Sequence, residues 1–332
     1  MKIMSKPAVS VVLPVFNGGK YLASAIGTII DQTFQDWELI CVNDGSTDQS
    51  RRVLEWFARS DKRIQVVHQE NRGIVGALNR GCELVRSDLI CRMDADDLAM
   101  PNRIANQVDF MQNYPDHVAV GGAILSIDVD SEPLALQVNA LDHETIVQRL
   151  LRRETGLFHP TTMIRTEAFR KIGGYRLKYQ WIEDHDLWLR LSQIGTLANT
   201  SELVLCYRQH AASVSWQRLN RQRELMTELI QEAHSLRNLV STGRVFSTPP
   251  LRSNAGPGKW ARMAAKGGYP RIAWKHLKAL WSESGLTWYS LRMSAEVGLR
   301  LPSAASLNRK IPSTIQVPDE AKWIAIAATC LT

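Results

Sequence analysis

The first hundred residues alternate between short apolar runs and stretches with helical spacing. The apolar runs are rich in β-branched residues and predict strands at residues 8–16, 37–43, 63–69 and 87–93. Between them, apolar side chains recur every three or four positions, which predicts helices at residues 18–32, 48–59 and 74–84. This β-α-β-α-β-α-β order predicts a parallel sheet with helices on both faces.

The same alternation continues for another hundred residues. Pro101 suits the first turn of a helix, residues 117–125 predict a strand, and a short helix follows from Thr166. Residues 181–195 predict the next clear helix, with an apolar stripe and a terminal glycine. We expect this part of the chain to form one α/β domain.

The pattern of apolar and polar residues changes in the last third of the chain. A helix is predicted at 217–240, then a loose linker at 248–259 and basic helical stretches around 260–300. We therefore expect an α/β domain over residues 1–216 and a basic, mainly helical region over residues 217–332.

Polar side chains follow each of the four predicted parallel strands. The strand exits are residues 14–17, 43–46, 71–73 and 94–97, and each exit contains polar or glycine residues. Ligands of open α/β sheets bind at the carboxyl ends of the strands. We expect these groups to converge at one edge of the sheet.

Three of these polar residues are carboxylates within four positions: Asp94, Asp96 and Asp97. Turn formation and capping before Pro101 would explain one of them but not all three, because packed carboxylates repel unless a cation neutralises them. Mg²⁺ typically binds through one or two carboxylates and substrate phosphates. The cluster therefore predicts a site for a metal and a diphosphate.

Other common nucleotide and metal motifs are absent from the sequence. No GxGxxG follows the first strand, and no GxxxxGK[ST] exists, which disfavours dinucleotide dehydrogenases and P-loop enzymes. An EF-hand starting at Asp94 would need Gly where Ala99 stands and Glu where Ala105 stands.

A second acidic group opens the helix predicted at 181–195. Glu183, Asp184 and Asp186 surround His185. Carboxylates at a helix N-terminus also serve the helix dipole, so this group alone is not specific. The neighbouring Trp181 and Trp188 would shield a carboxylate from water, and such a group can act as a general base.

Two histidines stand in polar turns beside apolar runs. A lone histidine is usually structural, and we interpret His159 as a loop residue that lines the site. His210 is the better ligand candidate, because neutral imidazole binds Mn²⁺-like ions.

The charge is unevenly distributed along the chain. The net charge is +7, but residues 217–332 hold 17 Lys and Arg against 7 Asp and Glu. Basic and aromatic residues mix at 260–281, which would suit an anionic lipid surface as well as an ordinary solvated helix face. The α/β part carries no nucleic-acid motif, so we expect no nucleic-acid partner.

The remaining composition points to a reducing compartment. The five cysteines show no CxxC pair and no regular spacing, which favours buried free thiols. The N-terminus lacks the apolar run of a signal peptide, and no window approaches about 18 consecutive apolar residues. We expect a cytoplasmic protein, attached at most to the inner face of the cytoplasmic membrane.

Taken together, these segments resemble the family 2 glycosyltransferases, which have the GT-A fold. The resemblance covers most of residues 8–216 and rests on motifs in the family's order, namely VSVVLPVFNGGKYLASAIGTIIDQTFQDWELICVNDGSTD, NRGIVGALNRGCELVRSDLICRMDADD, HPTTMIRTEAFRKIGGY, EDHDLWLRL and YRQHAASVS. It implies an inverting, metal-dependent transferase that uses a nucleotide-diphosphate sugar.

The resemblance also implies roles at the nucleotide end of the site. Asp44 resembles the carboxylate that contacts the base, and Arg72 and Gly73 lie in the segment that lines the nucleotide pocket. Pro14, Val15 and Asn17 lie nearby.

The reacting end follows in the same way. Asp94 and Asp96 match the ends of the DxD motif, with Asp96 as the metal contact and Asp97 as support. His210 resembles the histidine that completes the metal site in some GT-A enzymes. Asp184 resembles the catalytic base, next to Glu183.

The implied reaction moves a sugar from a UDP-sugar or a related donor to a hydroxyl of a saccharide or lipid-linked saccharide, with Mn²⁺ or Mg²⁺, in bacterial cell-surface polysaccharide synthesis. Two alternatives remain: a non-catalytic nucleotide-sugar-binding module, and a Mg²⁺-dependent phosphatase of the haloacid dehalogenase type. The phosphatase motif normally follows the first strand, whereas here DxD follows the fourth.

Overall fold

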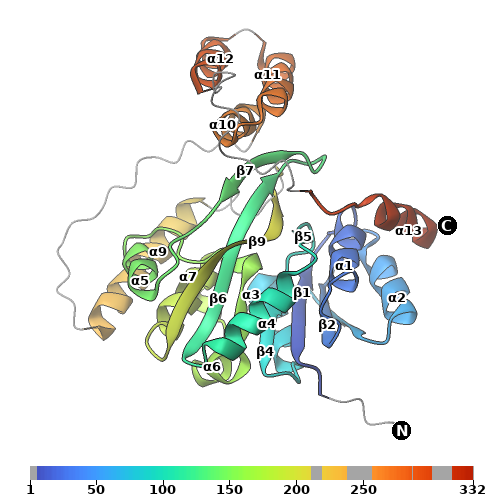
Figure 1. The fold of residues 1–332 in the computed structure, drawn as a ribbon, viewed down its shortest axis with the longest axis vertical. Coiled ribbons are helices and arrows are strands. Elements are labelled where there is room, and N and C mark those ends of the chain that lie inside the picture. The colour runs from blue at the N-terminus through green and yellow to red at the C-terminus, as the bar shows by residue number, and fades with distance from the viewer. Residues whose placement is uncertain (1–5, 211–218, 238–255, 286, 301–315, 332) are drawn as a thin grey trace.

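The computed structural model describes residues 6–210, 219–237, 256–285, 287–300 and 316–331. One sheet forms its centre, and helices cover both faces (Figure 1). The first four strands are β1 (Val9–Val15), β2 (Trp37–Asp44), β3 (Ile64–Gln69) and β4 (Leu89–Arg92). They pair in parallel in the order β3-β2-β1-β4, which confirms the predicted parallel unit.

The apolar runs of the central strands are continuous because both faces of the sheet are covered. Val11 and Leu13 of β1 face a core shared with α1 (Leu22–Ile30) and α2 (Ser50–Ser60). Val12 faces a second core shared with α3 (Gly73–Glu83). Alternate side chains of one strand thus hold the helices of both layers.

The second half of the sheet is mixed. It adds β5 (Leu98–Ala99), β6 (His117–Ile127), β7 (Pro133–Gln137), β8 (Met163–Arg165) and β9 (Thr196–Arg208). β8 is antiparallel to both β4 and β6, β6 is parallel to β9, and β5 is antiparallel to β9. Of these strands, the sequence pattern predicted only β6. β5 places the chain directly after the acidic cluster against the end of β9.

The helices that surround this half are α4 (Arg103–Asn113), α5 (His143–Leu151), α6 (Thr166–Lys171), α7 (Glu183–Leu191) and α9 (Leu219–Leu236). Two short 3₁₀ helices, η1 (His159–Thr161) and η2 (Leu177–Tyr179), precede β8 and α7. Leu225 and Leu229 of α9 are buried in the same core as α3 and α7. The first helix beyond the predicted boundary at residue 216 therefore packs into the α/β part.

The remaining helices form two separate attachments (Figure 1). α10 (Pro257–Gly267), α11 (Pro270–Ser284) and α12 (Trp288–Arg300) enclose their own small core, which also takes in Leu134 of β7. α13 (Ala321–Leu331) returns to α1 and α2, where Trp323 is buried. Most of the linker predicted at 248–259 lies outside the described residues.

Two further expectations concern the cysteines and the membrane. Cys41, Cys82, Cys91 and Cys206 are buried free thiols, as predicted. Within the described parts of the chain, every helix is too short or too polar to cross a bilayer.

Candidate active site

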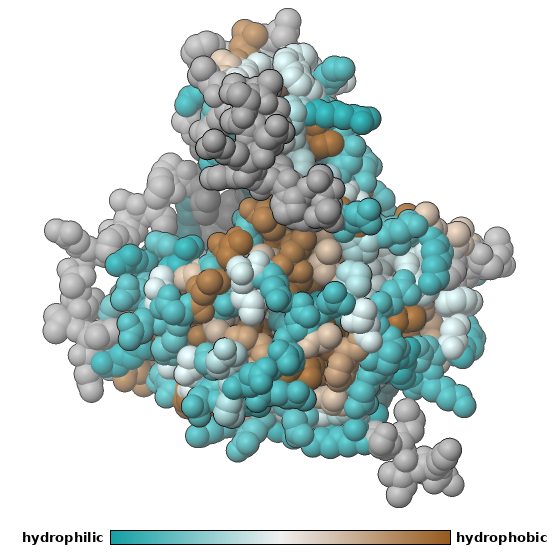
Figure 2. All heavy atoms as spheres, in the orientation of Figure 1, coloured by the Kyte–Doolittle hydropathy of each residue, from teal (hydrophilic) through white to brown (hydrophobic). Residues whose placement is uncertain are grey.

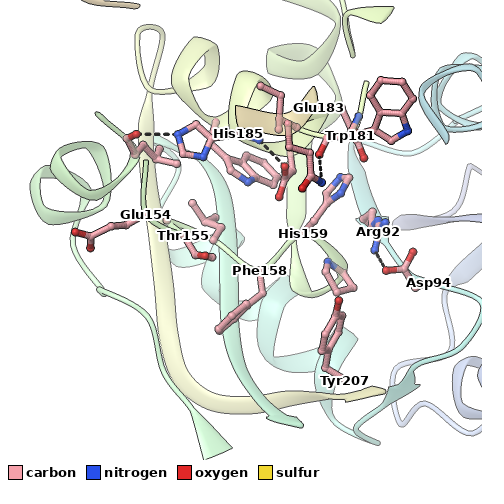
Figure 3. A pocket seen from close by; sticks show the side chains of 18 of the residues that line it. Arg92, Asp94, Glu154, Thr155, Phe158, His159, Trp181, Glu183, His185 and Tyr207 are labelled. Atoms are coloured by element: carbon pink, nitrogen blue, oxygen red, sulfur yellow. Dashed lines mark hydrogen bonds and ion pairs between the residues drawn. The ribbon is translucent and has the colours of Figure 1, made fainter. Parts of the chain in front are cut away.

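A cavity of about 620 Å³ lies at the end of β4. Arg92, Asp94 and Asp96 line it from the β4 side, and Glu183 and Asp184 line it from the start of α7. In Figure 3, Asp94 and Arg92 stand at one end of this pocket and His185 and Glu154 at the other. The structure therefore brings together both acidic groups singled out in the sequence, which are some ninety residues apart.

Residues 94–97, which we call the DADD loop, hold their three carboxylates close together. One oxygen from each of Asp94, Asp96 and Asp97 lies within 4.8 Å of the other two. Asp94 pairs with the buried Arg92 guanidinium. Burial and the other two carboxylates raise the pKa of Asp97 well above its usual value. The loop concentrates more negative charge than its own side chains neutralise.

Asp97 is fully buried and orders the loop from inside. Its Oδ1 accepts a hydrogen bond from the Arg208 backbone N–H at 2.9 Å. Its Oδ2 is also buried and has no hydrogen-bond partner in the described parts of the chain. A buried carboxylate oxygen without a donor needs a proton or a nearby cation.

His210 reaches the same loop from the end of β9. Its Nε2 lies 2.7 Å from Asp96 Oδ2, and its ring lies beside Tyr21, with the centroids 5.8 Å apart. Carboxylate oxygens with one imidazole nitrogen are a donor set that suits Mn²⁺ or Mg²⁺-like ions. The donor set and the unpartnered Asp97 oxygen both fit a divalent cation at this loop.

The carboxylates of α7 divide between the cavity and the interior. Asp184 lines the cavity, and its Oδ1 accepts the His185 backbone N–H at 2.8 Å. Asp186 is fully buried between the guanidinium groups of Arg176 and Arg190. Asp184 is therefore available to a ligand, whereas Asp186 is committed to the protein's own structure.

Glu183 lines the cavity, as Asp184 does, and is buried, as Asp186 is. Its Oε2 accepts the Trp181 backbone N–H at 2.6 Å. Burial, and then the neighbouring Asp184 charge, raise the pKa of Glu183 to about 7. Glu183 holds a proton more readily than an ordinary glutamate, which limits the repulsion on Asp184.

His159 also lines the cavity, from η1 (Figure 3). Its Nε2 lies 2.7 Å from the Tyr175 hydroxyl, and its ring stands edge-on to Trp188. Burial and the nearby Arg92 charge lower its pKa well below the usual value. His159 is thus a neutral, fixed part of the cavity wall.

Of the residues predicted to bind the nucleotide, Asp44, Arg72 and Gly73 do not line this cavity, although Ile74, the next residue along, does. Asp44 is buried, and its Oδ1 accepts hydrogen bonds from Gln69 Nε2 at 2.7 Å and from the Arg72 backbone N–H at 2.8 Å. Gly73 follows with a positive φ of 75° and approaches Gln180. The Asp44 carboxylate therefore orders the segment that precedes α3.

The exit of β1 is tied to the exit of β2. Pro14 and Val15 are buried in β1 and pair with β2. Asn17 Oδ1 accepts the Thr47 backbone N–H at 2.8 Å, and the Asn17 N–H donates to Ser46 Oγ at 3.0 Å. These contacts place the two exits side by side, as the parallel sheet predicts.

Several lining residues had no signal in the sequence. Gln222, Arg223 and Met226 of α9 form one wall, although they lie beyond the resemblance. Arg92 lies two positions before Asp94, inside the strand predicted at 87–93, and nothing in the sequence sets it apart. Other unpredicted lining residues include Glu154, Thr155, Phe158, Tyr207 and Gln209.

Comparison with known proteins identifies the family. A sequence model described as Glycosyl transferase family 2 matches residues 10–173. An uncharacterized glycosyltransferase of Haemophilus influenzae is 33% identical over 221 residues, which covers 63% of this chain and 68% of that protein. The chain is a family 2 glycosyltransferase. The phosphatase alternative loses its support, because the DxD motif on which it depended lies within the region matched by the glycosyltransferase model.

Solved structures show the fold of this glycosyltransferase. S. aureus TarS 1–349 in complex with UDP-GlcNAc has a TM-score of 0.52 and 14% identity, covering 88% of this chain and 89% of that chain. The mannosyltransferase PcManGT of Pyrobaculum calidifontis, in complex with GDP-Man and Mn²⁺, has a TM-score of 0.51 and 15% identity, covering 99% and 86%. The predicted GT-A fold is confirmed.

Proposed function

We propose that this glycosyltransferase moves a sugar from a nucleotide-diphosphate sugar to a hydroxyl of a saccharide or lipid-linked saccharide, with inversion at the anomeric carbon. One observation carries the proposal: Asp94 and Asp96 line the same cavity as Asp184. The site thus offers a place for a diphosphate beside a free carboxylate that can accept a proton. Bacterial cell-surface polysaccharide synthesis is the proposed setting.

The donor end is assigned to the DADD loop and the strand exits beside it. Asp96 and His210 would hold a divalent cation, Mn²⁺ or Mg²⁺, with Asp94 as the second end of the motif and Asp97 as buried support. The bound cation would neutralise the diphosphate leaving group and orient it. Asp44, Arg72 and Gly73 are assigned to the nucleoside, with Pro14, Val15 and Asn17 beside them.

A nucleotide sugar is the donor class that two neighbours of the same fold support. One was solved with UDP-GlcNAc and the other with GDP-Man and Mn²⁺. Each of these ligands joins a sugar to a diphosphate, which is the charge pattern that the DADD loop would complement. A UDP-sugar is our first candidate.

The acceptor end is assigned to the α7 side of the cavity. Asp184 would remove the proton of the acceptor hydroxyl as that oxygen attacks the anomeric carbon from the face opposite the diphosphate. A single displacement of this kind inverts the configuration. Because burial and the neighbouring carboxylate raise the pKa of Glu183 to about 7, Glu183 would add less negative charge beside Asp184 at lower pH.

The walls of the cavity suit a sugar and shield the reaction. Phe158, Trp181 and Tyr207 supply aromatic surface, and Gln222 and Met226 of α9 add cover. Ligand sites commonly combine such apolar walls with a few polar groups. Transfer rather than hydrolysis requires that water be kept from the donor.

An anionic membrane surface is the proposed partner of the α10–α12 unit. Residues 257–300 hold eight Lys and Arg against two Glu. Along α11, Arg271, Trp274 and Lys278 are exposed at helical spacing, with Trp274 45% exposed. Mixed basic and aromatic faces of this kind bind anionic lipid headgroups.

The structure narrows which residues this surface can include. Trp260 is buried in the core of the unit, and Lys275 is engaged by Asp128, Asp130 and Glu132. Figure 2 shows one face of the molecule, on which apolar side chains gather on the α/β part just below this unit.

We expect the protein to co-sediment with phosphatidylglycerol vesicles but not with phosphatidylcholine vesicles. Equal binding to both would contradict the proposal that the basic residues of the unit bind anionic headgroups.

The test of the proposed function has two stages. A thermal-shift screen of nucleotide sugars, with and without Mn²⁺, should show stabilisation by one donor that depends on the metal. The labelled form of that donor should then give a glycosylated acceptor of inverted configuration. Binding without product from any acceptor would instead favour a non-catalytic module.

A further inference from the structure

Arg208, the last residue of β9, holds the DADD loop at two adjacent points. Its Nε donates to the Asp96 carbonyl at 2.8 Å, and its backbone N–H donates to Asp97 Oδ1 at 2.9 Å. Its side chain is buried, and its guanidinium lies over the Tyr21 ring, 4.3 Å from the centroid. Two residues further on stands His210, whose Nε2 contacts Asp96. One residue therefore fixes the spacing between the two candidate metal ligands.

The other nitrogens of Arg208 are bound from outside the loop. Nη1 donates to Ser131 Oγ at 2.7 Å and to the Asp128 carbonyl at 3.2 Å, both in the β6–β7 turn. Nη2 contacts both carboxylate oxygens of Glu320 at 3.1 Å. A planar guanidinium with each nitrogen engaged is held in a single orientation.

Glu320 belongs to a short segment that crosses the sheet edge beside the loop. We call residues 316–323 the C-terminal strap. Val317 packs against the cluster of Leu98, Leu125, Ile127 and Cys206, and Leu98 follows Asp97 directly. Trp323 is buried against α1, and its Nε1 donates to Asp31 at 3.0 Å. The strap is thus anchored on both sides of Glu320.

We propose that Arg208 is a positioning residue for the metal and diphosphate site, and that Glu320 of the strap keeps it in place. The physical reason is that Asp96 sits on an irregular loop whose own carboxylates repel one another. A fixed donor on the Asp96 carbonyl, two residues from His210, sets the direction from which both ligands approach a cation. This inference rests on the proposed function, which assigns Asp96 and His210 to the cation.

The test compares Glu320→Gln and Arg208→Lys with Lys322→Gln in the full chain. Lys322 lies two residues from Glu320, is exposed, and pairs with Asp31, so its substitution leaves the contact between Arg208 and Glu320 in place. Calorimetric titration with UDP and with GDP, with and without Mn²⁺, gives the metal-dependent affinity. Steady-state kinetics give the KM for the donor and for the acceptor separately.

We expect Glu320→Gln and Arg208→Lys to weaken Mn²⁺-dependent nucleotide binding at least tenfold and to raise the donor KM, with the acceptor KM unchanged. Lys322→Gln should behave as wild type. A purely structural role would lower the melting temperature or kcat and leave the affinity of the folded protein unchanged. Glu320→Gln leaves Arg208 itself in place, so it keeps the test valid if Arg208→Lys folds poorly.

Wild-type Mn²⁺-dependent affinity and donor KM in folded Glu320→Gln would overturn the inference and leave the proposed function standing. If the wild-type protein binds neither nucleotide with Mn²⁺, the proposed function fails and the inference fails with it.

Discussion

His210 Nε2 lies 2.7 Å from Asp96 Oδ2, although 114 positions separate the two residues. The contact forms because Leu98 of β5 pairs with Cys206 of β9, four positions before His210. This pairing holds the DADD loop close to His210. A carboxylate oxygen and an imidazole nitrogen at this distance can share a proton or face a common cation. The contact therefore links the metal proposal to the architecture of the sheet edge.

Removing either member of this pair should weaken nucleotide binding only when metal is present. We expect Asp96→Ala to abolish Mn²⁺-dependent binding of UDP or GDP. His210→Ala should weaken it by about tenfold, which corresponds to about 1.4 kcal/mol. Asp88→Asn is a suitable control, because Asp88 is exposed and precedes β4, at the end opposite to Asp94. Unchanged titrations for Asp96→Ala would remove the metal role.

The raised pKa of Glu183 should make the stability of the protein depend on pH. With a folded pKa of about 7 and an ordinary value of 4.5, the folded state retains a proton that the unfolded chain has already lost. Stability from this group is therefore present at low pH and is lost as the pH rises from about 5 through 7.

Glu183→Gln keeps an oxygen that can accept the Trp181 N–H but removes the titration. We expect its melting temperature to exceed that of the wild type by more at pH 8 than at pH 5. Glu167→Gln, an exposed change in α6, should show no such trend. A constant difference across this range would show that Glu183 does not hold the extra proton.

Truncation of Asp186 should lower the free energy of unfolding, because Asp186 is buried in the interior whereas Asp184 lines the cavity. Asp186→Ala leaves the Arg176 and Arg190 guanidinium groups without their shared buried carboxylate. Breaking such a group costs about 3–5 kcal/mol of unfolding free energy. Urea denaturation should detect this loss, whereas Glu55→Ala, which breaks an exposed pair with Arg51, should leave the midpoint unchanged. A small effect of Asp186→Ala would mean that the arginines find other partners.

Two glycine substitutions should have opposite signs. Alanine is about 1 kcal/mol better than glycine inside a helix. At Gly27 of α1, however, a Cβ would overlap the Trp323 ring, so Gly27→Ala should destabilise the protein by roughly 1–3 kcal/mol. Nothing lies within 4 Å of a Cβ at Gly298 of α12, so Gly298→Ala should stabilise by up to about 1 kcal/mol. Stabilisation by both changes would show that α13 does not dock on α1.

The parallel part of the fold could be predicted because it is written in local patterns. Val9–Val15 and Trp37–Asp44 are mostly apolar and are buried along their whole length, as expected of strands covered on both faces. The acidic loop and the α7 carboxylates were also visible, since each clusters within a few positions. The parallel order then implied that polar strand exits share an edge.

The rest depends on contacts between distant segments, which local patterns do not encode. β5 is only two residues long and exists because β9 lies beside it. Gln222 and Met226 reach the cavity because α9 packs against α5 and into a core that α7 also enters. The apolar stripe of α9 predicts a buried face but not the elements that cover it. Arg208 and Glu320 are 112 positions apart. Asp186 is buried while Asp184 lines the cavity because Arg176 and Arg190 lie beside Asp186.

The proposed reaction depends on Asp184 accepting the proton of the acceptor hydroxyl. Its most direct test is single-turnover transfer by Asp184→Asn, measured beside calorimetric nucleotide affinity in the same preparation. We expect transfer to fall by at least 10³-fold while nucleotide affinity stays within about twofold of wild type. Transfer at an undiminished rate in Asp184→Asn would contradict it.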